Sequence, residues 1–125
     1  MAQNIMKQKL TPYFTVCNAD KFINFAICVF EAKLLKDDRN SNDRVQHARL
    51  LIEDNVLMLN EAFEIYKPNI SQVHLNVNDI EKTYNLAIKN GATSLMKPML
   101  RPHERKMAGF GDTCGNIWWI AETVI

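Results

Sequence analysis

Two stretches of the chain have the residue pattern of half-buried β-strands. Residues 11–16 form a short run rich in β-branched and aromatic residues, and residues 72–77 alternate strictly between apolar and polar side chains. Because successive side chains of a strand point to opposite faces, the second run has one apolar and one polar face. Its apolar residues are Val73, Leu75 and Val77, and its polar residues are Gln72, His74 and Asn76.

A helix is predicted after each of these strands, because apolar residues then recur at helical spacing. Asn18 is expected to cap the first helix and Asn78 the second, with acidic residues in each first turn. Gly91 is expected to end the second helix. The residues predicted to face the core are Phe22, Ile23, Ala26, Ile27 and Phe30 in the first helix, and Ile80, Tyr84, Leu86, Ala87 and Ile88 in the second.

Three shorter extended segments are predicted to follow each helix, so that each half of the chain reads β-α-β-β-β. The predicted segments are 33–36, 44–52 and 55–61 in the first half, and 94–97, 105–111 and 116–122 in the second.

The two halves are also similar to each other in sequence. At an offset of 61 positions, residues 16–61 align without a gap and give ten identities, where composition alone would give roughly three. We therefore predict one domain, residues 1–125, made of module one (about 9–64) and module two (about 69–125). The identical pairs are Val16 and Val77, Lys21 and Lys82, Asn24 and Asn85, Ala26 and Ala87, Ile27 and Ile88, Leu34 and Leu95, Lys36 and Lys97, Arg44 and Arg105, Asn55 and Asn116, and Glu61 and Glu122.

Composition narrows the class of protein. The chain is 47% hydrophobic and 23% charged, with a net charge of +1, which argues against disorder and against a basic nucleic-acid-binding surface. No apolar run approaches the roughly 20 residues needed to span a bilayer, and the first residues lack a signal-peptide pattern. Three cysteines without Cys-x-x-Cys spacing are expected to be reduced thiols. We expect a cytoplasmic protein with neither nucleic acid nor a membrane as a partner.

The paired modules carry motifs of a known family. The segments LTPYFTVCNADKFINF, HARLLIEDNVLMLNE, NVNDIEKTYNLAIKNGAT and GFGDTCGNIWWIAE together resemble the vicinal oxygen chelate superfamily, and within it the glyoxalase/bleomycin-resistance-like proteins. The resemblance covers nearly the whole chain. It implies an α+β fold in which tandem βαβββ modules form a curved mixed sheet, with helices on the convex face and a ligand on the concave face. It also implies a homodimer.

The resemblance further implies where a divalent metal would bind in enzymes of this superfamily. The first-strand ligand positions fall on Thr11 and Gln72, and the last-strand positions fall on Met58 and Trp119. Of these residues only Gln72 is a plausible ligand for a hard metal, so the superfamily metal site is expected to be missing, and no cofactor is predicted. The weak candidates for a metal site of another kind are Gln72, His74 and His47.

The two adjacent tryptophans are expected to have different environments. By strand alternation Trp118 points toward the covering helix and into the core, whereas Trp119 points toward the concave face. Aromatic and polar residues expected on that face form the predicted ligand-binding set. This set comprises Tyr13, Thr15, Met58, Gln72, His74, Asn76 and Trp119.

We therefore predict a metal-free protein that binds a small molecule, with no catalytic residue identified. Two alternatives stay open: a metal-dependent lyase, isomerase or dioxygenase of the same superfamily, and a non-catalytic interaction module.

Overall fold

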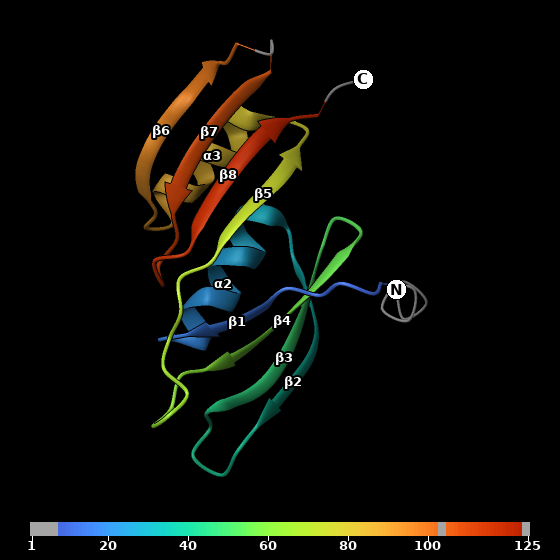
Figure 1. Cartoon of the computed structure of the whole chain (residues 1–125), viewed down its shortest axis with the longest axis vertical. Coiled ribbons are helices and arrows are strands. Elements are labelled where there is room, and N and C mark those ends of the chain that lie inside the picture. The colour runs from blue at the N-terminus through green and yellow to red at the C-terminus, as the bar shows by residue number, and fades with distance from the viewer. Residues whose placement is uncertain (1–7, 103–104, 124–125) are drawn as a thin grey trace. The chain divides into compact units, whose positions relative to one another are not determined.

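The computed structural model describes residues 8–102 and 105–123. The chain divides into two compact units, Met1–Asn69 (module 1) and Ile70–Ile125 (module 2). Each described module contains one helix and one four-stranded mixed sheet (Figure 1). The predicted α+β architecture of tandem βαβββ modules is confirmed. Neither helix in the described part of the chain is long and apolar enough to cross a membrane.

The two sheets have the same topology. In each module the first strand pairs in parallel with the last strand, and the remaining pairs are antiparallel. The strand orders are β1-β4-β3-β2 and β5-β8-β7-β6. The elements of module 1 are β1 (Tyr13–Val16), α2 (Ala19–Phe30), β2 (Lys33–Arg39), β3 (Val45–Ile52) and β4 (Asn55–Glu61), and those of module 2 are β5 (Gln72–Val77), α3 (Ile80–Lys89), β6 (Thr93–Leu100), β7 (Lys106–Gly111) and β8 (Ile117–Glu122).

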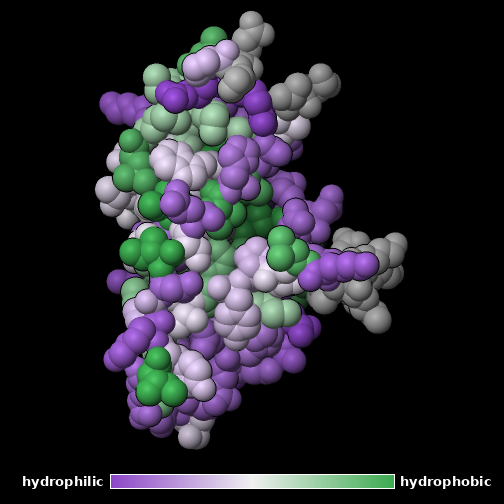
Figure 2. All heavy atoms as spheres, viewed as in Figure 1, coloured by the Kyte–Doolittle hydropathy of each residue, from purple (hydrophilic) through white to green (hydrophobic). Residues whose placement is uncertain are grey.

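The strand predictions are within two residues for most strands and too short for β2 and β6. β4 and β5 have the predicted bounds, whereas β2 and β6, at the edges of their sheets, extend three residues beyond the predicted ends. β2 and β6 are both largely exposed and contain register shifts, so neither shows an alternating apolar pattern along its full length. In the view of Figure 2, the surface around β2 and β3 is mainly hydrophilic.

The offset of 61 residues found in the sequence is also present in the structure. Val16 pairs with Glu61 at the end of β1, and Val77 pairs with Glu122 at the equivalent place in β5. The two helices begin 61 residues apart as well.

One of the two predicted helix caps is wrong. Asn18 caps α2 as predicted, because its Oδ1 accepts a hydrogen bond from the backbone N–H of Lys21 at 3.1 Å. In α3 the cap is Asp79 rather than Asn78, and its Oδ1 accepts from the backbone N–H of Lys82, also at 3.1 Å. Asp79 has the extended backbone of a capping residue, with φ of −132°, so Asn78 lies one residue too early.

Each helix buries one side against its own sheet, and most of the predicted core positions are correct. Two are wrong, because Ile27 and Ile88 are 40% and 38% exposed, and Leu86 is only half-buried. Each isoleucine follows a fully buried alanine, and one residue turns the helix by roughly 100°, which carries both isoleucines past the buried side. Phe25 and Val29 complete the buried side of α2. The other core residues of the helices are Ala19, Phe22, Ile23, Ala26 and Phe30 in α2, and Ile80, Tyr84 and Ala87 in α3.

The corrected cap gives a test of the local structure of module 2. Replacing Asp79 with Ala removes the acceptor for the N–H of Lys82 and should lower the free energy of unfolding by about 1 kcal/mol. The matched substitution Asn78→Ala should change it by less than half of that. Urea unfolding followed by circular dichroism measures both. Equal losses in the two variants, or a larger loss for Asn78→Ala, would show that the cap is misplaced.

Candidate functional site

The two tryptophans of β8 lie on opposite faces of the module 2 sheet, as predicted. Trp118 is 1% exposed and lies in the core, where its Nε1–H donates to Oδ2 of the buried Asp112 at 2.8 Å. Trp119 is half-buried and lies on the face opposite α3, which we call the helix-free face of module 2. The position of Trp119 therefore depends on the core packing of its neighbour.

Trp119 lies directly over Gly109, its partner in β7. A Cβ atom at position 109 would lie 2.5 Å from Cε3 of the indole, a separation that real side chains do not reach. Glycine is therefore required here so that the ring can rest on the backbone of β7. The indole Nε1–H donates to Oε1 of Gln72 at 2.9 Å, which fixes the ring within its plane.

The other predicted residues of β5 lie on the same face. His74 is exposed and stands directly opposite Trp119 in the parallel β5–β8 pair. Asn76 is also on this face, but its Oδ1 accepts a hydrogen bond from Nη2 of Arg105 at 2.6 Å. The row of His74, Trp119, Gly109 and Met96 crosses all four strands.

The equivalent row of module 1 contains different side chains. Tyr13 stands opposite Met58, which stands opposite Arg49, and Lys36 completes the row. Tyr13 and Met58 lie 61 residues before His74 and Trp119, so the two rows are equivalent by sequence and by register. Module 1 therefore presents two cations on its helix-free face, where module 2 presents a glycine and a methionine.

One further residue of module 1, His47, is close to this row. The hydroxyl of Tyr13 lies 3.4 Å from Nδ1 of His47, on β3. The pKa of His47 is held below its usual value, first by burial and then by the charges of Arg49 and Lys36, with Asp38 acting in the opposite direction. The imidazole therefore stays neutral to a lower pH than a free histidine.

Thr15 is less available to a ligand than predicted. Its hydroxyl donates to Oδ1 of Asn60 at 2.8 Å, and its backbone N–H and C=O pair with Asn69.

The residues present do not fit the metal site of the superfamily. Thr11 precedes β1, and Met58 and Trp119 lack a ligand atom for a hard metal. The amide oxygen of Gln72 already accepts the indole N–H of Trp119. Within residues 8–102 and 105–123, no three His, Cys, Asp or Glu side chains are grouped so that they could hold a metal ion.

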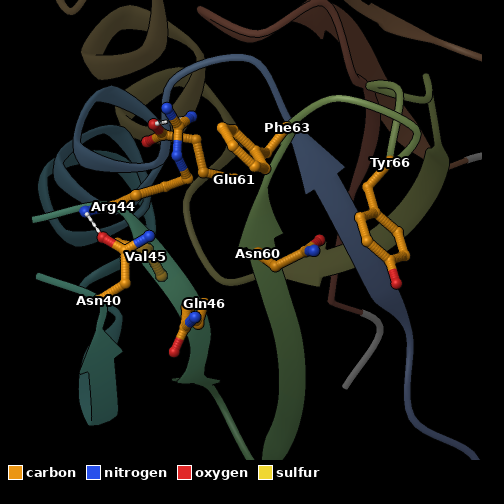
Figure 3. Close-up of a pocket in the computed structure, with 8 residues that line it drawn as sticks. All are labelled: Asn40, Arg44, Val45, Gln46, Asn60, Glu61, Phe63 and Tyr66. Carbon is orange, nitrogen blue, oxygen red and sulfur yellow. Dashed lines mark hydrogen bonds and ion pairs between the residues drawn. The ribbon is translucent and has the colours of Figure 1, made fainter. Parts of the chain in front are cut away.

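Module 1 also contains a pocket of about 290 Å³ that the sequence analysis did not predict (Figure 3). Nη1 of Arg44 pairs with Oε2 of Glu61 at 3.3 Å, and the guanidinium lies over the ring of Phe63 at 4.3 Å. The other oxygen of Glu61 accepts from the backbone N–H of Ala19 at 3.0 Å, so this carboxylate anchors the start of α2 and is not simply solvated. The lining residues are Asn40, Arg44, Val45, Gln46, Asn60, Glu61, Phe63 and Tyr66.

The pocket was missed because its aromatic residues follow β4 in a segment without a motif. Phe63 and Tyr66 pair with each other through their backbones. The one sequence feature that indicates a role for this region is Arg44, which the sequence repeat aligns with Arg105. In both modules this arginine donates to a backbone carbonyl at or just after the end of the last strand, to Ala62 in module 1 and Glu122 in module 2.

Comparison with solved structures identifies the fold. The chain is similar to TioX from Micromonospora sp. ML1, with a TM-score of 0.79 at 17% identity over 94% of this chain and 99% of that chain. It is similar to a member of the glyoxalase/bleomycin resistance protein/dioxygenase superfamily from Sphaerobacter thermophilus, with a TM-score of 0.70 at 14% identity over 94% and 99% of the two chains. It is also similar to TnmS3, an antibiotic binding protein from Streptomyces sp. CB03234, with a TM-score of 0.70 at 19% identity over 94% and 98%.

At these identities the likeness establishes the fold, which is that of the vicinal oxygen chelate superfamily, as the sequence motifs indicated. No protein-family model matches the chain, and a sequence comparison with curated proteins gives no match.

The contact between Trp119 and Gly109 gives a second test. Gly109→Ala should displace the indole, change the tryptophan fluorescence and near-UV circular dichroism spectra, and cost about 1–3 kcal/mol of stability. Gly111→Ala is the matched control on the same strand, because its nearest neighbouring atom would lie 4.0 Å away. In a Trp119→Ala background, Gly109→Ala should leave the spectra of Trp118 unchanged. Equal effects of the two glycine substitutions would rule out the described position of Trp119.

Proposed function

We propose that this protein, which has the fold of the vicinal oxygen chelate superfamily, binds a small molecule and that Trp119 forms the principal contact surface. The observation that carries the proposal is the fixed indole of Trp119, which rests on Gly109 and is hydrogen-bonded to Gln72. A planar ligand could stack on the ring face that points away from the sheet.

A fixed aromatic ring is well suited to binding. Offset stacking of two aromatic groups contributes about 0.5–1.5 kcal/mol beyond the burial of apolar area. The ring of Trp119 is already oriented, so a ligand does not have to order it, and less entropy is lost on binding. His74, exposed and directly opposite Trp119, offers a polar group to the edge of the ligand.

Methionines extend this surface across the sheet. Met96 stands opposite Gly109, and Met107 lies one pair further along the helix-free face, opposite Ala121 on one side and Met99 on the other. Unbranched thioether side chains adjust to ligands of different shape and make favourable contacts with aromatic rings. This surface suits a planar, largely apolar ligand.

The proposed binding requires no metal. This part of the proposal is supported by Met58 and Trp119, which occupy the last-strand positions where the superfamily resemblance places metal ligands. A metal-dependent lyase, isomerase or dioxygenase would need a ligand set of another kind, including His74.

The likeness to an antibiotic binding protein suggests a first set of compounds to test. We propose to screen aromatic antibiotics and aromatic metabolites by thermal shift, and to measure the affinity of each hit by fluorescence. Trp119→Ala should weaken binding about tenfold or more, and Trp119→Phe should weaken it less, because the phenyl ring keeps part of the stacking surface.

The control for this experiment is Ile88→Ala, which removes an exposed apolar side chain from the outer side of α3 in the same module. Ile88→Ala and prior treatment with EDTA should both leave the affinity unchanged. Hits that bind Trp119→Ala as tightly as the wild type would contradict the proposed surface. Loss of binding after EDTA, restored by a divalent metal, would favour the metal-dependent alternative.

We also propose that the protein acts as a homodimer. Support comes from the segment between β4 and β5, where several large apolar residues are exposed on module 1 and at the start of module 2. Light scattering after size exclusion should give twice the mass of 14.4 kDa. A monomer at the highest soluble concentration would exclude the dimer. The exposed residues are Phe63 (45%), Ile65 (81%), Tyr66 (62%) and Ile70 (69%).

A further inference from the structure

Arg49, on the helix-free face of module 1, is a cation without a counter-ion among the described residues. It is half-buried, its Nε is buried, and no described residue forms a hydrogen bond or an ion pair with its guanidinium. The other arginines of module 1 are paired: Arg39 with Asp20 at 2.7 Å, and Arg44 with Glu61 at 3.3 Å. Arg49 is therefore the exception among the arginines described in this module.

The neighbouring charges do not compensate Arg49. Lys36, directly across from it in β2, is itself cationic and pairs with Asp38 at 3.4 Å. Asp38 is thus already engaged, and it stands across from His47 rather than Arg49. Residues 1–7, which lie outside the described part of module 1, include no acidic residue. Module 1 therefore offers no free carboxylate to Arg49 within its own row.

The lowered pKa of His47 is consistent with a positive potential at this place. Burial contributes most to the shift, followed by Arg49 and Lys36, and only Asp38 opposes them. Groups from three strands thus bear on the imidazole: Tyr13 from β1, Arg49 from β3 itself, and Lys36 and Asp38 from β2.

We propose that Arg49 binds the anionic group of a small-molecule ligand, and that this group is a carboxylate on an apolar body. The inference rests on the proposed function and adds a residue outside the predicted binding set. A guanidinium whose Nε is buried without a hydrogen-bond partner is unfavourable, and a carboxylate bound by two parallel N–H···O bonds, one of them from Nε, relieves that cost.

The surroundings of Arg49 indicate the body of the ligand. Met58 lies directly across from Arg49 in β4, and Tyr13 lies one strand further along the same row. Leu51 is on the same face of β3. These side chains would contact an aliphatic or aromatic group, and the phenol of Tyr13 could donate a hydrogen bond to a second oxygen. A free phosphate would use the charge of Arg49 but not these apolar contacts.

The test is an NMR titration with benzoate, with the uncharged benzamide and inorganic phosphate as comparisons. The readouts are the Nε–H signal of Arg49 and the ring signals of His47, assigned with His47→Gln. Benzoate should shift both sets of signals with saturation and should raise the pKa of His47, because a bound anion offsets the charge of Arg49. Benzamide and phosphate should each bind at least about tenfold more weakly than benzoate.

Three variants make the result specific. Arg49→Met keeps the length of the side chain and removes the charge, and should weaken benzoate binding about tenfold or more. Arg49→Lys keeps the charge without the planar fork, and should be intermediate. Arg101→Met, at an exposed arginine of module 2, should have no effect.

The inference is overturned if benzoate causes no saturable change of the signals up to about a 50-fold molar excess over the protein. It is also overturned if benzamide binds as tightly as benzoate. Binding of benzoate to Arg49→Met with the affinity of the wild type would also overturn it. If phosphate binds more tightly than benzoate, the proposal of a carboxylate ligand is wrong and the site is one for phosphate. The experiment is independent of Trp119, so the proposed stacking surface in module 2 and the anion site in module 1 can fail separately.

Discussion

The arrangement of the candidate residues on the strands follows from one constraint, which is that a single amphipathic helix covers one face of each sheet. Alternate strand residues must be apolar to pack against that helix, as Phe14 and Leu59 do in module 1 and Trp118 and Ile120 do in module 2. The residues between them are forced onto the other face. Trp119 is therefore held on the helix-free face because Trp118 is held in the core.

The sequence repeat means that the two modules carry the same positions with different chemistry. Arg49 and Gly109 occupy corresponding places, each across from the last-strand position of its module, Met58 or Trp119. At one place the sheet carries a cation beside a methionine, with no ion-pair partner in the described part of the chain. At the other, the missing side chain gives an indole room to lie on the backbone.

Much of the fold could be predicted from the sequence, because strand alternation, helical spacing and the repeat all reflect burial. Predictions failed where burial was not the deciding factor. Asp79 rather than Asn78 caps α3. Both residue types are good caps, and only the local backbone geometry decides which of two neighbours takes the capping position. Ile27 and Ile88 are apolar but lie just beyond the buried sides of their helices.

The candidate site was less predictable than the fold, because its properties depend on partners that are distant in sequence. Thr15 and Asn76 were placed in the binding set by strand alternation, yet hydrogen bonds to Asn60 and Arg105 occupy the hydroxyl of Thr15 and the amide oxygen of Asn76. The sequence alone did not predict a role for Arg49, because an arginine within a strand is usually paired or solvated. Only the register of β2, β3 and β4 shows that its neighbours leave the charge unbalanced.

The most direct test of the central claim is a nuclear Overhauser experiment on Trp119 in the presence of a ligand from the compound screen. The account predicts cross-peaks between the indole ring protons and the Hα protons of Gly109, with and without ligand, and new cross-peaks between the ligand and the same indole ring. If the Gly109 cross-peaks are absent in the free protein, or if the bound ligand contacts no proton of Trp119, the account is contradicted.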